Sequence, residues 1–271
     1  MSKVARALAA LLSLSTVALA GVEASAYVWY TAKDSGEPMR WFRTELTVKV
    51  STVEPGEVDW QTMYDIVEAS FASWDIPGCK IPQVDVIGTT TAKTITSPTK
   101  FTDEPDNIVV FIPTTAAWRQ LPGSTGTQIA LTFIAHNTET GEIIDADIAV
   151  NDGGFQFTTT DDATSGIDLL ASITHEVGHF FGMDHSLDNT ATMYATYGDN
   201  VAARTAARTL EDDDMDGVCG LYEDVPAWVD PNKPVTPPSE SCAAGGAQAP
   251  WVLAFAVVAL FALRRRRAYT A

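Results

Sequence analysis

Basic residues are scarce in this sequence. Seventeen lysines and arginines stand against 35 aspartates and glutamates, which gives a formal net charge of −18. Phosphate binding needs a basic surface, so this imbalance argues against a nucleic-acid partner. The acidic character suits solubility outside the cell, and its carboxylates allow calcium sites. The plainer interpretation is that most of these charges form a solvated surface.

Cysteine is also scarce, with three residues in the whole chain. Cys79 and Cys219 lie in the part of the sequence with a globular composition, whereas Cys242 lies beyond a proline-rich stretch. Disulfides are typical of exported chains. We therefore predict a Cys79–Cys219 bridge, with Cys242 left over and in need of its own explanation.

The first 26 residues have the pattern of a secretory signal peptide. Lys3 and Arg6 precede an apolar run from Ala7 to Ala20, and Ala24–Ala26 is a small-x-small cleavage site. A buried N-terminal helix is the alternative. The position of the run, behind basic residues at the terminus, favours the signal peptide.

The C-terminal end indicates a linker followed by a sorting tail. Residues 225–241 contain five prolines and predict a stiff linker. In the tail, 242–271, residues 247–263 predict a transmembrane segment, and Arg264–Arg267 would stay cytoplasmic. Cys242, this apolar run and the arginines together resemble the Myxo-CTERM tail of myxobacterial surface proteins. That resemblance implies processing near Cys242, whereas a plain membrane anchor or a buried helix are the alternatives.

Residues 27–224 remain as one domain without internal repeats. Aromatic residues between 27 and 43 are expected to anchor that segment onto the domain. Hydrophobic periodicity predicts helices over 58–74, 167–181 and 209–222, and strands over 45–50, 83–87, 107–112, 129–135 and 143–150.

Three of the four histidines lie within eleven residues. His175 and His179 are four apart, which places both on one face of a helix where they can hold one metal ion. Gly182 can end the helix in a left-handed turn and bring His185 to the same metal. Three such ligands and one open position describe a catalytic zinc site. Glu176 lies beside the first ligand and can take a proton from water; ordinary surface histidines are the alternative.

The pattern HExxHxxGxxH is the metzincin signature, and residues 175–185 resemble it at every fixed position. Met193 stands where these enzymes place a structural methionine turn. Tyr194 follows it directly, as in the matrixin branch, and Ala195 stands where other branches have a zinc-binding tyrosine. The resemblance to bacterial matrixin-like enzymes extends over residues 45–222. It implies an α+β fold, with a twisted mixed sheet, an active-site helix and a C-terminal helix.

The resemblance also implies a mechanism. Zinc polarises the scissile carbonyl, Glu176 acts as general base, and the substrate lies extended along an edge strand, for which residues 128–136 are the candidate. The specificity pocket would take its wall from the segment after Met193, including Tyr197. No cysteine lies between Tyr27 and Glu45, so we expect no cysteine-switch latency.

A second metal site has weaker support. His136 is the one histidine outside the motif, and a lone histidine is more often a surface or core residue, so we predict one zinc. Calcium sites are possible near Asp145, Asp147 and Asn151, or at 212–216, where the sequence pattern resembles the start of an EF-hand loop. We favour a helix cap at 212–216.

The sequence thus predicts an exported bacterial zinc endopeptidase, monomeric, acting on protein or peptide substrates at the cell surface or after release. An inactive surface binding module on a metzincin scaffold is the alternative, and the intact Glu176 and three histidines count against it. A peptidase dedicated to one envelope partner is a third possibility.

Overall fold

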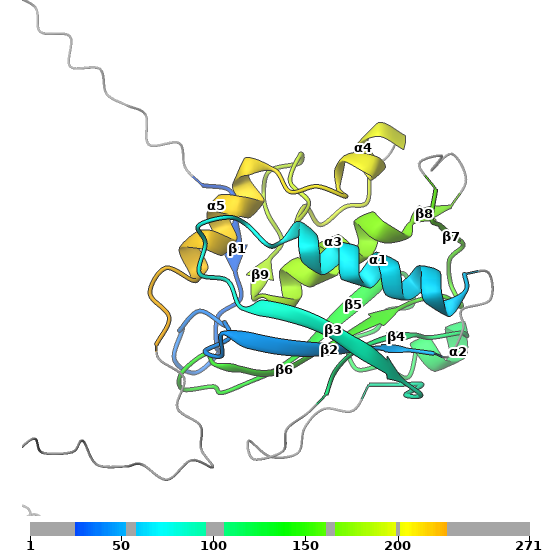
Figure 1. The fold of residues 1–271 in the computed structure, drawn as a ribbon, viewed down its shortest axis with the longest axis horizontal. Coiled ribbons are helices and arrows are strands. Elements are labelled where there is room, and N and C mark those ends of the chain that lie inside the picture. The colour runs from blue at the N-terminus through cyan, green and yellow to red at the C-terminus, as the bar shows by residue number, and fades with distance from the viewer. Residues whose placement is uncertain (1–24, 53–57, 96–105, 161–165, 199–200, 227–271) are drawn as a thin grey trace, which may run out of the picture. The chain divides into compact units, whose positions relative to one another are not determined.

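A mixed five-stranded sheet lies beneath two long helices (Figure 1). The computed structural model describes residues 25–52, 58–95, 106–160, 166–198 and 201–226. The strands are β1 (Val28–Trp29), β2 (Glu45–Ser51), β3 (Gln83–Thr90), β4 (Asn107–Phe111), β5 (Ala130–His136), β6 (Ile143–Val150), β7 (Phe157–Thr158), β8 (Ile167–Asp168) and β9 (Met183–Asp184). The helices are α1 (Trp60–Ser73), α2 (Thr115–Trp118), α3 (Leu169–Phe180), α4 (Val201–Ala206) and α5 (Asp212–Leu221).

The order of the strands in the main sheet is β3-β2-β4-β6-β5. The pairs β2–β3, β2–β4 and β4–β6 are parallel, whereas β5 runs antiparallel to β6. The sheet is therefore mixed, and with its helices it confirms the predicted α+β fold. The strand β5, expected to bind substrate, lies at one edge of the sheet.

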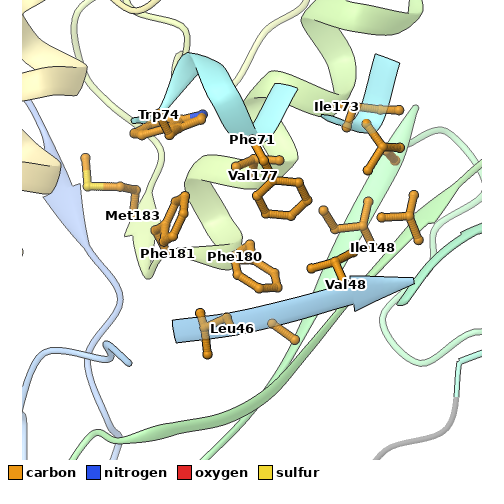
Figure 2. Packing of buried hydrophobic residues seen from close by; sticks show 14 of the residues in the cluster. Leu46, Val48, Phe71, Trp74, Ile148, Ile173, Val177, Phe180, Phe181 and Met183 are labelled. Atoms are coloured by element: carbon orange, nitrogen blue, oxygen red, sulfur yellow. The ribbon is translucent and has the colours of Figure 1, made fainter. Parts of the chain in front are cut away.

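The main core fills the space between this sheet and the helices α1 and α3 (Figure 2). Strand β2 alternates as its sequence predicts, with Leu46 and Val48 buried and Glu45 exposed. Phe71 of α1 and Phe180 of α3 meet edge to face, with ring centroids 5.1 Å apart. Strand β4 is buried along its whole length, because a second hydrophobic cluster covers the other face of the sheet.

The eight predicted elements are present, and the helices begin later than predicted. Helix α3 begins at Leu169, because Ile167 pairs with Phe157 and the Asp168 carboxylate accepts from the Ala171 amide at 3.0 Å as an N-cap. Helices α1 and α5 likewise begin after the capping residues Asp59 and Glu211.

Several short elements were not anticipated: α2, α4 and the two-residue strands β1, β7, β8 and β9. Segments of two to six residues carry too few positions for a hydrophobic period. Strand β1 exists because it pairs with β9, more than 150 residues later in the chain.

The aromatic N-terminal segment packs onto the domain as expected. The indole of Trp41 is buried and donates to the carbonyl oxygen of Phe180 at 2.8 Å, and that of Trp29 donates to Gly217 at 2.8 Å. The loop after α1 is joined to α5 by a disulfide between Cys79 and Cys219, whose Cα atoms lie 5.1 Å apart. This bond links segments 140 residues apart in sequence.

Several expectations concern residues that the structure does not describe. They are the signal peptide as far as residue 24, the linker from residue 227, and the tail with Cys242 and residues 247–263. Within the described ranges, no helix has both the length and the apolar character needed to cross a membrane.

Candidate metal centre

Helix α3 places the first two histidines, and the turn after it places the third. The helix ends at Phe180 with Phe181 as its C-cap, and Gly182 follows with φ +97°, a left-handed conformation that suits glycine. A Cβ atom on Gly182 would lie 2.0 Å from the carbonyl oxygen of Met39, so no larger residue fits there. The chain then turns back through β9 and brings His185 close to His175 and His179.

The three histidines converge. Their ring centroids are 4.8 to 5.2 Å apart, and one potential ligand atom from each lies within 4.8 Å of the others. The carbonyl oxygen of Thr192 is 2.6 Å from Nδ1 of His175, and that of Met183 is 2.8 Å from Nδ1 of His179. A carbonyl can only accept, so each Nδ1 carries the proton and each Nε2 keeps its lone pair for a metal.

The protonation states fit metal binding as well. Burial lowers the pKa of His175 to about 4, and burial with the neighbouring His175 holds the pKa of His179 well below its usual value. Burial also lowers the pKa of His185. All three rings are therefore neutral near pH 7, which is the form that binds zinc. The donor set, three neutral imidazoles of which His175 and His179 have oriented lone pairs, fits a catalytic zinc ion.

Glu176 follows the first ligand and points toward β5. Glu176 is 6% exposed, and burial raises the pKa of its carboxyl group to about 7, while the hydrogen bond from Thr132 opposes the rise. The Thr132 hydroxyl is 2.6 Å from Oε2 of Glu176. A carboxyl group with a pKa near neutrality can both take and return a proton. Thr132 was missed by the sequence analysis, since nothing in the sequence links it to a residue 44 positions away.

The turn containing Met193 supports the histidines from below. Met193 is fully buried beneath α3, where a Cβ atom on Gly178 would lie 2.1 Å from its sulfur. Asp214 of α5 accepts from the amides of Thr192 and Met193 at 2.8 and 2.9 Å. The carbonyl oxygen of Thr192 in this turn orients the His175 ring. By holding the turn in place, Asp214 therefore helps to position His175. The sequence suggested a helix cap or a calcium ligand for this aspartate.

A cavity of about 500 Å³ opens in front of the histidines. Residues 127–132 of the β5 edge form one wall, and the chain after Met193, including the predicted Tyr197, forms another. The lining residues that the sequence did not predict include Arg204 of α4 and Tyr30, whose ring centroid is 5.4 Å from that of His179. Tyr30 reaches the site because its amide donates to the Gly182 carbonyl at 2.9 Å.

The other metal candidates do not join this site. Asp212–Asp216 begin helix α5, so the favoured helix cap is confirmed over the EF-hand loop. Asp145 is buried, and burial followed by the charges of Asp147 and Asp106 raises its pKa to about 8. Asn151 donates to the Gln128 carbonyl at 2.9 Å. The histidine triad is the one converging group of His, Cys, Asp or Glu found among the described residues; His136 lies outside it.

Part of this chain is similar to known matrixins. The sequence pattern of the matrixin peptidase family matches residues 120–223. Matrilysin of Homo sapiens is 43% identical over 63 residues, 23% of this chain and 22% of that protein. Metalloendoproteinase 1 of Glycine max is 39% identical over 64 residues, 24% of this chain and 20% of its own.

A viral relative gives a longer match. The probable matrix metalloproteinase 095L of invertebrate iridescent virus 3 is 34% identical over 95 residues, 35% of this chain and 24% of its own length. The chain thus spans less than a quarter of each of these three relatives. The match over residues 120–223 includes the converging histidines, and together with the mixed sheet it shows a likeness to the matrixin family.

Proposed function

We propose that this chain is an exported zinc-dependent endopeptidase that hydrolyses peptide bonds of extracellular or envelope proteins. The observation that carries the proposal is the convergence of three neutral histidines beside the buried Glu176. His175, His179 and His185 would hold the metal. An inactive binding module needs neither a general base nor a hydroxyl group that orients it.

The chain's own residues account for the remaining chemistry. A bound zinc ion would supply the polarisation of the scissile carbonyl and the acidification of water. Glu176 takes a proton from the attacking water and returns it to the leaving amine, and Thr132 holds its carboxyl group in place. Strand β5 pairs only with β6 among the described strands, so its outer edge has free backbone groups for an extended peptide.

The proposal of export rests on the two ends of the sequence and on the disulfide. Residues 1–26 would be the leader, and residues 242–271 the tail that retains the protein at the envelope until processing at Cys242. The Cys79–Cys219 bond suits an oxidising compartment. N-terminal sequencing of the exported protein should begin at Tyr27; a mature protein that keeps the first 26 residues contradicts this part.

The activity is tested with the full chain and casein. Zinc-loaded protein should hydrolyse casein, a chelator should stop hydrolysis, and added zinc should restore it. Glu176→Ala should lower the rate by at least about 10³-fold, because general base catalysis typically contributes factors of about 10²–10⁴. Glu139→Ala, in an exposed turn, is the matched control. A zinc-loaded parent that cleaves no protein, or full activity in Glu176→Ala, overturns the proposal.

A further inference from the structure

The cavity in front of the histidines has a group of lining residues away from β5, and we call this part the side pocket. These residues come from α3, from the chain after the methionine turn, and from α4 and the residue that follows it. The residues of this side pocket are Ala171, Ser172, Tyr197, Ala203, Arg204 and Ala207. Four of the six have small side chains, which leaves room for a substrate side chain.

Arg204 is held in this pocket by two contacts. Its Nε donates to the Gly198 carbonyl at 2.8 Å, and its guanidinium carbon lies 5.2 Å from the centroid of the Tyr197 ring. The Tyr197 hydroxyl in turn accepts from the Asp168 amide. Neither of these contacts, both within the described ranges, uses a hydrogen bond from the outer nitrogens of the guanidinium group.

The charge of Arg204 lacks a carboxylate partner among the described residues. The neighbouring Arg208 differs, because its Nε lies 2.8 Å from the fully buried Asp168 carboxylate. Of the residues that the structure describes, Arg204 is the one lysine or arginine that lines the cavity, and Glu176 is the one acidic residue that does so. In a chain with twice as many acidic as basic residues, this pocket carries a fixed positive charge.

We propose that the side pocket selects a glutamate side chain of the substrate, next to the scissile bond. The inference rests on the proposed peptidase function. A guanidinium group binds a carboxylate through two parallel hydrogen bonds, a geometry that glutamine and leucine cannot satisfy. Tyr197 keeps the fork of donors in place, so little side-chain freedom is lost when the substrate binds.

The test uses the zinc-loaded full chain and a set of quenched fluorescent peptides. The peptides differ at one position beside the cleaved bond, which carries Glu, Gln, Leu or Lys; mass spectrometry identifies the bond. The parent should cleave the Glu peptide with a kcat/KM at least about tenfold above the Gln peptide, as expected where buried polar groups must be matched. Arg204→Met should reduce the Glu-to-Gln ratio to about one.

Two further variants keep the result interpretable. Arg204→Glu should invert the preference toward the Lys peptide, and Lys33→Met, an exposed cation elsewhere, should keep the parental ratio. A parent that prefers Leu to Glu, or a Glu-to-Gln ratio that survives Arg204→Met, overturns the inference. If no peptide is cleaved, the peptidase proposal fails instead. Peptide affinities measured by fluorescence anisotropy then still test the glutamate preference of the side pocket. The Glu peptide should bind at least about tenfold tighter than the Gln peptide.

Discussion

The two ends of the cleft are built differently. At the metal end, His175 and His179 are each fixed by a hydrogen bond to a backbone carbonyl, and the Met193 turn beneath them is tied to Asp214. At the far end, Arg204 is half-buried and is held by one carbonyl and one aromatic ring. The metal-binding histidines are thus immobilised by several buried contacts. Arg204, to which we assign selectivity, can be replaced at small cost to the stability of the fold.

The largest expected effect comes from breaking the support of the metal end. In Gly178→Ala the new Cβ atom would lie 2.1 Å from the Met193 sulfur and 2.7 Å from the Trp74 ring. Overpacking of this kind typically costs about 1–3 kcal/mol. We expect a loss near the upper value in urea unfolding, together with weaker zinc binding.

A helical glycine outside the cleft provides the control for that result. A Cβ atom on Gly220 of α5 would meet nothing closer than 3.3 Å. Gly220→Ala should change the stability by less than about 1 kcal/mol, because the gain in helix propensity offsets the tight contact. Equal losses in the two variants would mean that the Met193 turn is no more constrained than the rest of the fold.

A buried charge outside the cleft gives the next effect. The pKa of Asp145 is raised to about 8, so the folded state binds a proton that the unfolded state releases near pH 4. Its contribution to stability is present below pH 4 and is lost as pH rises toward 8. Asp145→Asn should remove this dependence and raise the free energy of unfolding at pH 9 by about 2 kcal/mol. This is less than the full shift would give at about 1.4 kcal/mol per pKa unit, because relaxation and water penetration offset much of the burial cost.

Urea unfolding at pH 5, 7 and 9, first without and then with added calcium, measures the free energy of unfolding of the parent and of Asp145→Asn. A parent whose stability rises between pH 5 and 9 while Asp145→Asn follows the same course would contradict the assignment. The burial of the Asp145 carboxyl group would have no catalytic use, unlike the burial of the Glu176 carboxyl group.

The smallest effect on activity is expected at Thr132, whose hydroxyl group contacts Glu176. Thr132→Val keeps the shape of the side chain and removes the hydroxyl that contacts Glu176. We expect kcat to fall about tenfold, in line with the roughly 1 kcal/mol of a hydrogen bond to a side chain. The lost bond lowered the pKa of Glu176, so the acidic limb of the pH profile should move upward. Thr127→Val, on the same wall of the cavity, should leave that limb where it is.

The metal end was accessible to sequence analysis because its residues are local. A helical period and one glycine relate His175, His179 and His185, and the alternation of Leu46, Val48 and Val50 identified a strand in the same way. Thr132, Tyr30 and Arg204 were not accessible, because each reaches the cleft through the packing of a separate segment. The start of α3 was missed for a similar reason, since Asp168 became a cap only where β8 pairs with β7.

Native mass spectrometry with metal analysis measures whether the three histidines hold one zinc ion. The purified full chain should carry one zinc, Glu176→Ala should retain it, and His179→Ala should bind it at least about 10³-fold more weakly, since each ligand contributes several kcal/mol. A parent chain that binds no zinc at one equivalent, or a His179→Ala variant that binds it as tightly as the parent, would contradict the account.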